Sequence, residues 1–430
     1  MHSLGYALDF KQKRVVKTGM LSVETNVGGT EIYMDGKLKG KTGAIFKNAL
    51  EKNLLPKTYK IELKKDGYYP WQKNLEIKEM LATEIKSILL LPAVSQKQLV
   101  LEKKVQSFFV SPDERKIAYT LPNNKLEVLN LDNQNTYSIL GADKIDLVFW
   151  AADSKSLFFR AQADKKISYF VWQEDDLVPT DLNKFLNGIV NPVEFKWHPK
   201  DSTQIYFLSR KGNSASLYKI DFLNKAVLPE ILKNVKNYEI SDDGIYFLDK
   251  KSGFLFKTDF EGKSRQQLTL LALPNYNEKD DYKIIPLGSK IYLIDGNGNF
   301  YILNSDLKIF EKSGENIKEV KLSGDSKKLL YYGENEVWVL YLEDFLIQPF
   351  HYKGDKELIA RFSSPIENVF WYPDDGHLII IVQNIAKITE LDGRDVRNTV
   401  DFLTGEQIDY VRAEKEIYFL ENGNLYSAKL

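Results

Sequence analysis

Histidines are the side chains of this sequence best suited to metal binding or proton transfer, and there are four: His2, His198, His351 and His377. None lies in an HxH or HExxH arrangement, which would place two imidazoles on one face of a strand or helix. His198 and His377 fall in or beside turns between strands. The chain has no cysteine, which excludes disulfides, thiolate nucleophiles and iron–sulfur clusters. The sequence therefore predicts no metal site.

One segment begins like a calcium-binding loop. Residues 295–299 read Asp-Gly-Asn-Gly-Asn, and Asp306 falls at the twelfth position of such a loop. Phe300 occupies the position at which that loop requires glycine, and strands rather than helices are expected on both sides. Segments 333–336 and 421–424 occupy the same place in other repeats. A hairpin turn accounts for the segment more simply than calcium binding.

Motifs for catalysis are missing from the sequence. There is no G-x-S-x-G elbow, no glycine-rich phosphate loop before a helix, and no candidate base for a serine nucleophile. A hydrolase or lyase that uses carboxylates of a central channel is the weakest of our alternatives. Its candidate residues are Asp280, Asp281, Asp355 and Glu357. The presence of these carboxylates is explained more simply if they are solvent-exposed charges of loops. We expect a protein that is not an enzyme, with no catalytic residue and no cofactor.

Composition narrows the class of protein further. The 430 residues contain 59 Lys and Arg against 60 Asp and Glu, so no basic field favours nucleic acid as a partner. Hydrophobic residues make up 43% and charged residues 28%, as in a globular protein. No run of eighteen apolar residues occurs, and no signal peptide opens the chain.

A repeated pattern occupies the chain after about residue 105: an apolar strand, a polar turn that often contains Asp, and an aromatic-rich strand. The second strands of the eight copies begin at Ile117, Leu157, Ile205, Ile245, Ile291, Leu329, Leu378 and Ile417. The intervals between them are 40, 48, 40, 46, 38, 49 and 39 residues. A period near forty with several strands per copy predicts an all-β chain with a β-propeller, one copy per blade.

The turns of this repeat carry a family resemblance. Segments 111–114 (Ser-Pro-Asp-Glu) and 372–376 (Tyr-Pro-Asp-Asp-Gly) resemble the W-S-P-D-G-K turn of TolB-like and other WD-like propellers, and segment 261–269 resembles the ending of their outer strands. Trp150, Trp197 and Trp371 precede such turns at equivalent positions. This register predicts packing between neighbouring blades rather than a cage for a ligand.

The ends of the repeat region predict how the propeller closes. The last copy has only three strands before Leu430, while the strand at residues 98–103 stands unassigned ahead of the first copy. We expect that strand to complete the last blade of a propeller domain at residues 97–430, because closure removes open sheet edges. Short and long intervals alternate, so pairs of copies repeat every 88, 86 and 87 residues. An alternating ring favours eight blades, with seven as the alternative.

A different β pattern fills residues 19–92 and predicts a small β-sandwich. Residues 32–37 (Ile-Tyr-Met-Asp-Gly-Lys), with Gly40, Thr42, Gly67-Tyr68 and Trp71, resemble the skeleton of a PEGA domain. The tetrapeptide that names that family is replaced by Val-Gly-Gly-Thr at residues 27–30. The resemblance implies an extracytoplasmic module of bacterial and archaeal surface proteins, without known catalytic residues.

Residues 1–18 are expected to be a linker. In chains with related domains, a stretch like residues 5–10 commonly follows a membrane helix. We therefore expect the soluble part of a membrane-anchored bacterial envelope protein, held to the membrane by an N-terminal segment that this chain does not contain.

The expected function is a non-catalytic scaffold of the cell envelope, whose propeller binds a protein or a polymer. The three longer intervals of the repeat place long connections at residues 173–188, 270–283 and 342–364. The alternative is a glycan- or cell-wall-binding module, which would need exposed aromatic side chains in these connections. The candidate partner-binding residues in these connections are Tyr276, Tyr282, Phe345, Phe350 and Tyr352. The sequence names no partner and indicates no oligomeric state.

Overall fold

The fold is taken from a computed structural model, which describes residues 6–9, 14–174, 176–212, 214–412 and 415–430. Apart from the 3-10 helix η2 (Leu182–Lys184), the elements of these residues are β-strands, so the expectation of an all-β chain is confirmed. The expected linker lies partly outside the described residues, at 1–5 and 10–13. Its described part contains the antiparallel strands β1 (Tyr6–Asp9) and β2 (Arg14–Lys17). No helix among the described residues is long and apolar enough to cross a membrane.

The chain divides into two compact units. The first contains residues 1–98, 319–419 and 426–430, and the second contains residues 99–318 and 420–425. The candidate site belongs entirely to the first unit.

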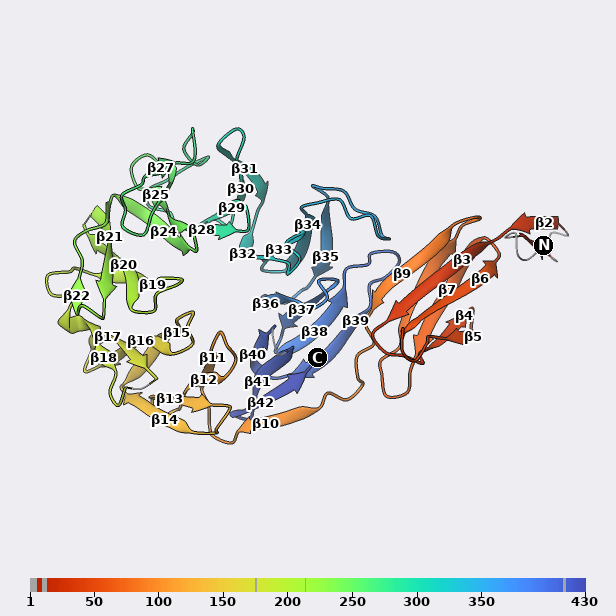
Figure 1. Cartoon of the computed structure of the whole chain (residues 1–430), viewed down its shortest axis with the longest axis horizontal. Helices are drawn as coiled ribbons and strands as arrows, with labels where there is room; N and C mark the ends of the chain where they lie inside the picture. Colours follow the sequence, from red (N-terminus) through yellow and green to blue (C-terminus); the bar gives the residue numbers. More distant parts are fainter. Residues whose placement is uncertain (1–5, 10–13, 175, 213, 413–414) are drawn as a thin grey trace. The chain divides into compact units, whose positions relative to one another are not determined.

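Two sheets in the first unit are built from residues 19–88 (Figure 1). One has the order β6–β3–β9, with β3 (Gly19–Thr25), β6 (Asn48–Leu54) and β9 (Ala82–Ile88). The other has the order β5–β4–β7–β8, with β4 (Glu31–Met34), β5 (Lys37–Lys41), β7 (Lys57–Lys64) and β8 (Trp71–Ile77). Alternate side chains of both sheets enter one core that includes Leu21, Ile32, Ile61 and Trp71. Asp35 and Gly36 join β4 to β5 with φ angles of 49° and 75°, as the Asp-Gly pair predicts.

Three further sheets contribute to the first unit. The first is β32–β33–β34–β35, with β32 (Ile317–Leu322), β33 (Lys328–Gly333), β34 (Glu336–Tyr341) and β35 (Lys356–Arg361). The second is β36–β37–β38–β39, with β36 (Ile366–Trp371), β37 (His377–Val382), β38 (Ile385–Glu390) and β39 (Thr399–Thr404). The third has the order β10–β42–β41–β40, with β10 (Lys97–Leu101), β40 (Glu406–Val411), β41 (Glu416–Glu421) and β42 (Asn424–Lys429). The early strand β10 thus lies beside the last strand of the chain, which is the pairing that the closure hypothesis requires. Closure of the whole ring stays a prediction.

The second unit contains five sheets of the same kind, each with antiparallel strands in chain order. The first two sheets consist of β11 (Ser107–Val110), β12 (Lys116–Thr120), β13 (Lys125–Asn130) and β14 (Thr136–Gly141), and of β15 (Lys144–Trp150), β16 (Ser156–Ala163), β17 (Lys166–Gln173) and β18 (Thr180–Asp181). The third sheet consists of β19 (Pro192–Trp197), β20 (Gln204–Lys211), β21 (Ser214–Asp221) and β22 (Ala226–Val227), and β23 (Leu232–Lys233) also pairs with β21. The last two sheets consist of β24 (Val235–Ser241), β25 (Gly244–Asp249), β26 (Leu255–Thr258) and β27 (Gln266–Gln267), and of β28 (Tyr282–Leu287), β29 (Lys290–Asp295), β30 (Phe300–Asn304) and β31 (Ile309–Gly314).

The repeated turn has the same hydrogen bonds in both units. The Ser111 hydroxyl donates to Asp113 at 2.6 Å and accepts from the Lys116 backbone at 3.0 Å. The corresponding bonds of Ser323, to Asp325 and from Lys328, measure 2.5 and 2.9 Å. In these two copies the serine therefore closes the turn at the start of the second strand.

The tryptophan row connects neighbouring sheets. The indole Nε1 of Trp150 donates to the carbonyl of Phe109 at 3.0 Å, and that of Trp371 donates to the carbonyl of Lys321 at 3.0 Å. Trp197 donates to the carbonyl of Phe149 at 3.4 Å. Each acceptor lies in the first strand of the preceding sheet, which agrees with packing between repeats and leaves no indole cage for a ligand.

Candidate functional site

The long connection between β34 and β35 forms one side of the candidate site. Phe345 and His351 exchange two backbone hydrogen bonds, of 2.7 and 3.1 Å, and so close the connection into a hairpin. The imidazole of His351 stacks on the ring of Tyr341, with centroids 3.9 Å apart and planes at 7°. The Asp355 carboxylate accepts from the backbone N–H of Tyr352 at 2.7 Å. The connection is therefore held in one shape by its own contacts.

Gln348, at the tip of this connection, binds the edge of strand β9. Its Oε1 accepts from the Glu84 backbone at 3.1 Å, and its Nε2 donates to the Ala82 carbonyl at 3.0 Å. Arg394 adds a second link, because it donates to Gln348 at 3.2 Å and to the Glu84 carbonyl at 2.9 Å. Three more bonds of the Arg394 guanidinium hold the carboxylate of Asp392. This network joins the connection, strand β9 and the segment after β38.

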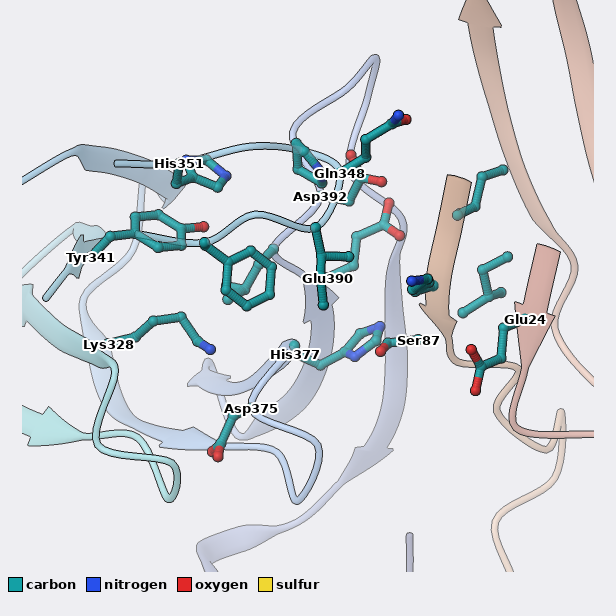
Figure 2. A pocket seen from close by; sticks show the side chains of 18 residues that line it. Glu24, Ser87, Lys328, Tyr341, Gln348, His351, Asp375, His377, Glu390 and Asp392 are labelled. Atoms are coloured by element: carbon teal, nitrogen blue, oxygen red, sulfur yellow. The ribbon is translucent and has the colours of Figure 1, made fainter. Parts of the chain in front are cut away.

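A cavity of about 190 Å³ lies between these elements (Figure 2). Its apolar lining includes Ile85 and Ile88 from β9 and Phe345, Ile347 and Leu391 from the opposite side. Its polar lining comprises Glu24, Lys86, Ser87, Lys328, Tyr341, Gln348, His351, Asp375, His377, Glu390 and Asp392. An apolar cavity with a few polar groups is the usual form of a binding pocket.

Two carboxylates around the cavity, Glu390 and Asp375, are engaged in structural hydrogen bonds. Glu390 accepts from the indole of Trp71 at 2.9 Å and from the ammonium of Lys73 at 2.7 Å. Asp375 accepts from the backbone N–H groups of Gly324 and Asp325, at 3.0 and 2.9 Å. Because their oxygens already have donors, these side chains fix the walls of the cavity rather than offer a general base.

The two histidines of the cavity have different environments. His377 contacts the Asp374 carboxylate through Nδ1 at 2.8 Å. Burial opposes ionisation of Asp374, but the bond to His377 and the backbone N–H of Gly376 outweigh it and lower the pKa of Asp374 below 3.8. The buried Nε2 of His351 has no hydrogen-bond partner among the described residues and lies 3.7 Å from Glu357. Burial lowers the pKa of His351 below 6.5, which favours a neutral imidazole.

Lys328 places a positive charge in the wall of the same cavity. Its side chain is 5% exposed, its Nζ lies 3.2 Å from the Asp325 carboxylate, and it sits 5.1 Å from the centre of the Phe345 ring. The ammonium is thus compensated by a carboxylate and an aromatic face.

A wider groove of about 520 Å³ adjoins the cavity and shares Gln348 and Pro349 with it. Its lining comprises Asn74, Leu75, Glu76, Lys78, Leu81, Ala82, Thr83, Gln348, Pro349, Phe350 and Arg394. Leu81 is 56% exposed and Phe350 is 58% exposed, and the neighbouring Met80 is also exposed. Exposed apolar side chains rimmed by charged ones are typical of a binding surface. We name this feature the Phe350 groove.

The structure brings together some of the five predicted partner-binding residues. Phe345 lines the cavity, Phe350 lines the groove, and Tyr352 is exposed on the same connection. Tyr276 and Tyr282 belong to the second unit, where their rings stack at 5.4 Å and pack into a core. Tyr282 is buried and its hydroxyl bonds to Asn277, so these two rings do not form an exposed platform. A role in binding stays a prediction for all five residues.

The weaker chemical candidates have ordinary contacts. The Asp295 carboxylate accepts from the backbone N–H groups of Asn297 and Asn299, at 3.0 and 2.8 Å, as in a hairpin turn. Asp280 accepts from the amide of Asn277 at 3.2 Å, and the side chain of Asp281 is 82% exposed. Glu357 pairs with Arg397. Among the described residues, no three His, Asp or Glu side chains come together as metal ligands.

Sequence reasoning missed Gln348, Arg394 and the pair formed by Lys73 and Glu390. Gln348 and Arg394 carry no signal, since a polar residue in a loop is unremarkable until its partner is known. Lys73 carries a signal, because it occupies an inward-facing position of β8 between the core residues Trp71 and Leu75. A lysine on a core face requires a buried partner.

One family model and several solved structures are similar to parts of this chain. Residues 18–89 match the family model described as "PEGA domain", which confirms that resemblance. No curated protein matches the sequence. Solved structures with a similar fold include the computationally designed Ika8 protein, at 9% identity and a TM-score of 0.50, covering 77% of this chain and 100% of that one.

Two further solved structures are named as propeller or WD40 domains. The C-terminal WD40 domain of Sif2 has 14% identity and a TM-score of 0.49, covering 78% of this chain and 98% of that one. The β-propeller domain of Cps50 (Swd1) from Myceliophteria thermophila has 11% identity and a TM-score of 0.44, covering 78% of this chain and all of that one. Such likeness concerns the fold alone. Residues 18–89 therefore match the PEGA family model, and the described residues after Gln96 form eight sheets of four or five strands.

Proposed function

We propose that this chain is a non-catalytic scaffold of the bacterial cell envelope, located outside the cytoplasm. A TolB-like propeller of eight blades, preceded by the PEGA domain, presents the Phe350 groove to a protein partner. The PEGA match supports the location, and the eight sheets formed by the described residues after Gln96 support the blade number.

The Phe350 groove is the observation that carries this proposal. Phe350 lies on a connection that Gln348 and Arg394 hold against β9, and Leu81 directly precedes β9, so both exposed side chains are presented in a fixed position. A rigid apolar groove with a charged rim suits a protein segment that inserts one or two apolar side chains. This surface would therefore lose little conformational freedom when a partner binds.

A capture experiment tests the proposal. The full chain is used as bait for cell-envelope extracts, beside the variants Phe350→Ser and Leu81→Ser. The control is Leu223→Ser, at a side chain that is 78% exposed in the second unit. We expect one protein to be captured by the wild type and the control, and at least about tenfold less by the groove variants, as for loss of a central apolar anchor.

Three outcomes would contradict the proposal. Equal capture by all four proteins would show that the groove takes no part in binding. Binding of purified cell-wall glycan that depends on Tyr352 and not on Phe350 would favour the glycan-binding alternative instead. Hydrolysis of such a polymer by the wild-type chain would overturn the non-catalytic assignment.

A further inference from the structure

A second exposed apolar feature lies at the tip of the PEGA domain, in the loop between β5 and β6. Ile45 is 83% exposed and Phe46 is 80% exposed. Single exposed apolar residues are common on protein surfaces, but two adjacent large ones at a loop tip form a small hydrophobic wedge. Neither residue lines the Phe350 groove or its cavity.

The loop that carries this wedge is held firmly. The backbone N–H of Gly43 donates to the Asn48 carbonyl at 2.9 Å, and that of Lys47 donates to the Gly43 carbonyl at 3.0 Å. The buried hydroxyl of Thr42 accepts from the Thr30 backbone at 3.0 Å. A Cβ atom at Gly28 would lie 2.4 Å from the Ala44 carbonyl oxygen, so the chain approaches the loop closely there. The wedge is therefore fixed in an outward position.

Lysines surround the wedge on both strands. Residues 37–52 contain five lysines, Lys37, Lys39, Lys41, Lys47 and Lys52, all of them exposed, and one acidic residue, Glu51, which is half-buried. Lys41 pairs with Glu31 at 2.8 Å. The other four lysines form no ion pair within the part of the chain that the structure describes. We call these five lysines, with Ile45 and Phe46, the basic strip.

The strands place the basic strip on one edge of the domain. β5 is the edge strand of one sheet and β6 is the edge strand of the other. They approach each other closely, because a Cβ atom at Gly40 would lie 2.8 Å from the Glu51 carboxylate. The two edge strands are thus neighbours, and the loop that carries the wedge connects them.

We propose that the basic strip docks the PEGA domain onto an anionic phospholipid bilayer. Ile45 and Phe46 insert between lipid headgroups, and the lysines lie over the phosphates. This combination of a small apolar wedge and flanking lysines is the composition of interfacial membrane contacts. Protein interfaces need about 800 Å² per partner and are depleted of lysine at their centre, so the basic strip suits a protein partner poorly.

Because the chain has no cysteine, a single label can test this docking. Phe46→Cys carries an environment-sensitive fluorophore and is mixed with vesicles of phosphatidylcholine, with or without about 30 mol% phosphatidylglycerol. We expect a blue shift with the anionic vesicles only, and its loss at high salt. The matched control is Leu307→Cys, labelled at a side chain that is 56% exposed in the second unit, which should show no shift.

Vesicle co-sedimentation of the unlabelled chain supplies the second measurement. Each lysine replaced by glutamine, at Lys39 or Lys47, should weaken binding to anionic vesicles about fivefold. The variant Ile45→Ser/Phe46→Ser should abolish most of it, while its thermal unfolding stays that of the wild type because both side chains are exposed. Phe350→Ser should bind vesicles normally, which keeps this test independent of the partner experiment.

Three results would overturn the docking proposal. The first is an absence of binding to anionic vesicles by the wild-type chain. The second is equal binding to neutral and anionic vesicles, and the third is binding that survives both the apolar and the lysine substitutions. Capture of a protein that depends on Ile45 and Phe46, without vesicle binding, would assign the basic strip to a protein partner instead.

Discussion

The ammonium of Lys73, on β8, lies 2.7 Å from the carboxylate of Glu390, at the end of β38, and both side chains are withdrawn from solvent. Lys73 also donates to the carbonyls of Asp392 and Val396, at 2.8 and 3.1 Å. Glu390 accepts three further hydrogen bonds, from Trp71 and from the backbone and side chain of Asn398. A buried charge pair of this kind joins the PEGA domain to the strand that lines the candidate site.

Removal of one partner of this pair should be costly. In Lys73→Met the Glu390 carboxylate stays buried without its counter-charge, so we expect the free energy of unfolding to fall by about 3–5 kcal/mol. Urea denaturation followed by tryptophan fluorescence measures it. The double variant Lys73→Met/Glu390→Gln should recover part of the loss, because it leaves no unpaired charge.

The control for that experiment is Lys60→Met, on the neighbouring strand β7. The Lys60 side chain is 50% exposed and pairs with Glu62 at 3.3 Å, so its loss should cost less than about 1 kcal/mol. Equal destabilisation by Lys73→Met and Lys60→Met would show that the buried pair contributes no more to the free energy of unfolding than the exposed pair.

The tryptophan row should behave as a structural feature. Trp371→Phe removes the hydrogen bond to the Lys321 carbonyl and part of a buried ring, so we expect a loss of about 1–3 kcal/mol. Trp338→Phe serves as the control, because Trp338 is half-buried and donates only to the carboxylate of Glu336. If Trp371→Phe unfolds at the wild-type temperature, the indole does not hold neighbouring sheets together.

The sequence predicted the elements of the fold well because each one has a local signal. The spacing of Ile117, Leu157 and their successors predicted the second strands, and all eight fall in the inner strands of four-stranded or larger sheets. Ile32 and Met34 alternate with polar residues and lie on the core face of β4. Strand β6 has a weaker local signal, because its lysine and asparagines favour a loop.

The site was much less predictable, because its contacts join distant parts of the chain. Phe345 and Phe350 were identified as aromatic residues of a long connection, which is a local property. Nothing local indicates that Gln348 binds the backbone of β9, or that Arg394 supports it. Tyr276 and Tyr282 have the same local signal as Phe350, and only the fold distinguishes their packed rings from an exposed one.

Strand β10 provides a test of propeller closure. Val100→Pro should disrupt the pairing of β10 with β42, because proline cannot donate to a strand ladder and its ring restricts the backbone. Deletion of residues 97–104 should have a larger effect of the same kind, with a lower unfolding temperature and aggregation through the exposed edge of β42. Val94→Pro is the control, since Val94 is exposed and precedes the strand. Wild-type thermal unfolding of the deletion variant would contradict closure by this strand.

His351 should make the candidate site sensitive to acid. Burial lowers the pKa of His351 below 6.5 in the folded protein, so the unfolded chain takes up the proton first as the pH falls. The stabilisation from neutral His351 is therefore fully present above about pH 6.5 and is lost as the pH falls through the lower folded pKa. The unfolding temperature should decrease between about pH 7.5 and pH 5, and His351→Phe, which keeps an aromatic ring against Tyr341, should reduce that decrease.

His198 provides the comparison for this pH dependence. Burial also lowers the pKa of His198. His198→Phe should therefore remove a separate part of the decrease in unfolding temperature as the pH falls. Only His351→Phe should change the pH dependence of partner capture, because the His351 imidazole, within the connection that carries Phe350, stacks on Tyr341. The carboxylates of Asp374 and Asp392, whose pKa values are lowered, contribute stability that is lost only at more acidic pH. An unchanged slope in His351→Phe would show that protonation of this imidazole does not destabilise the site.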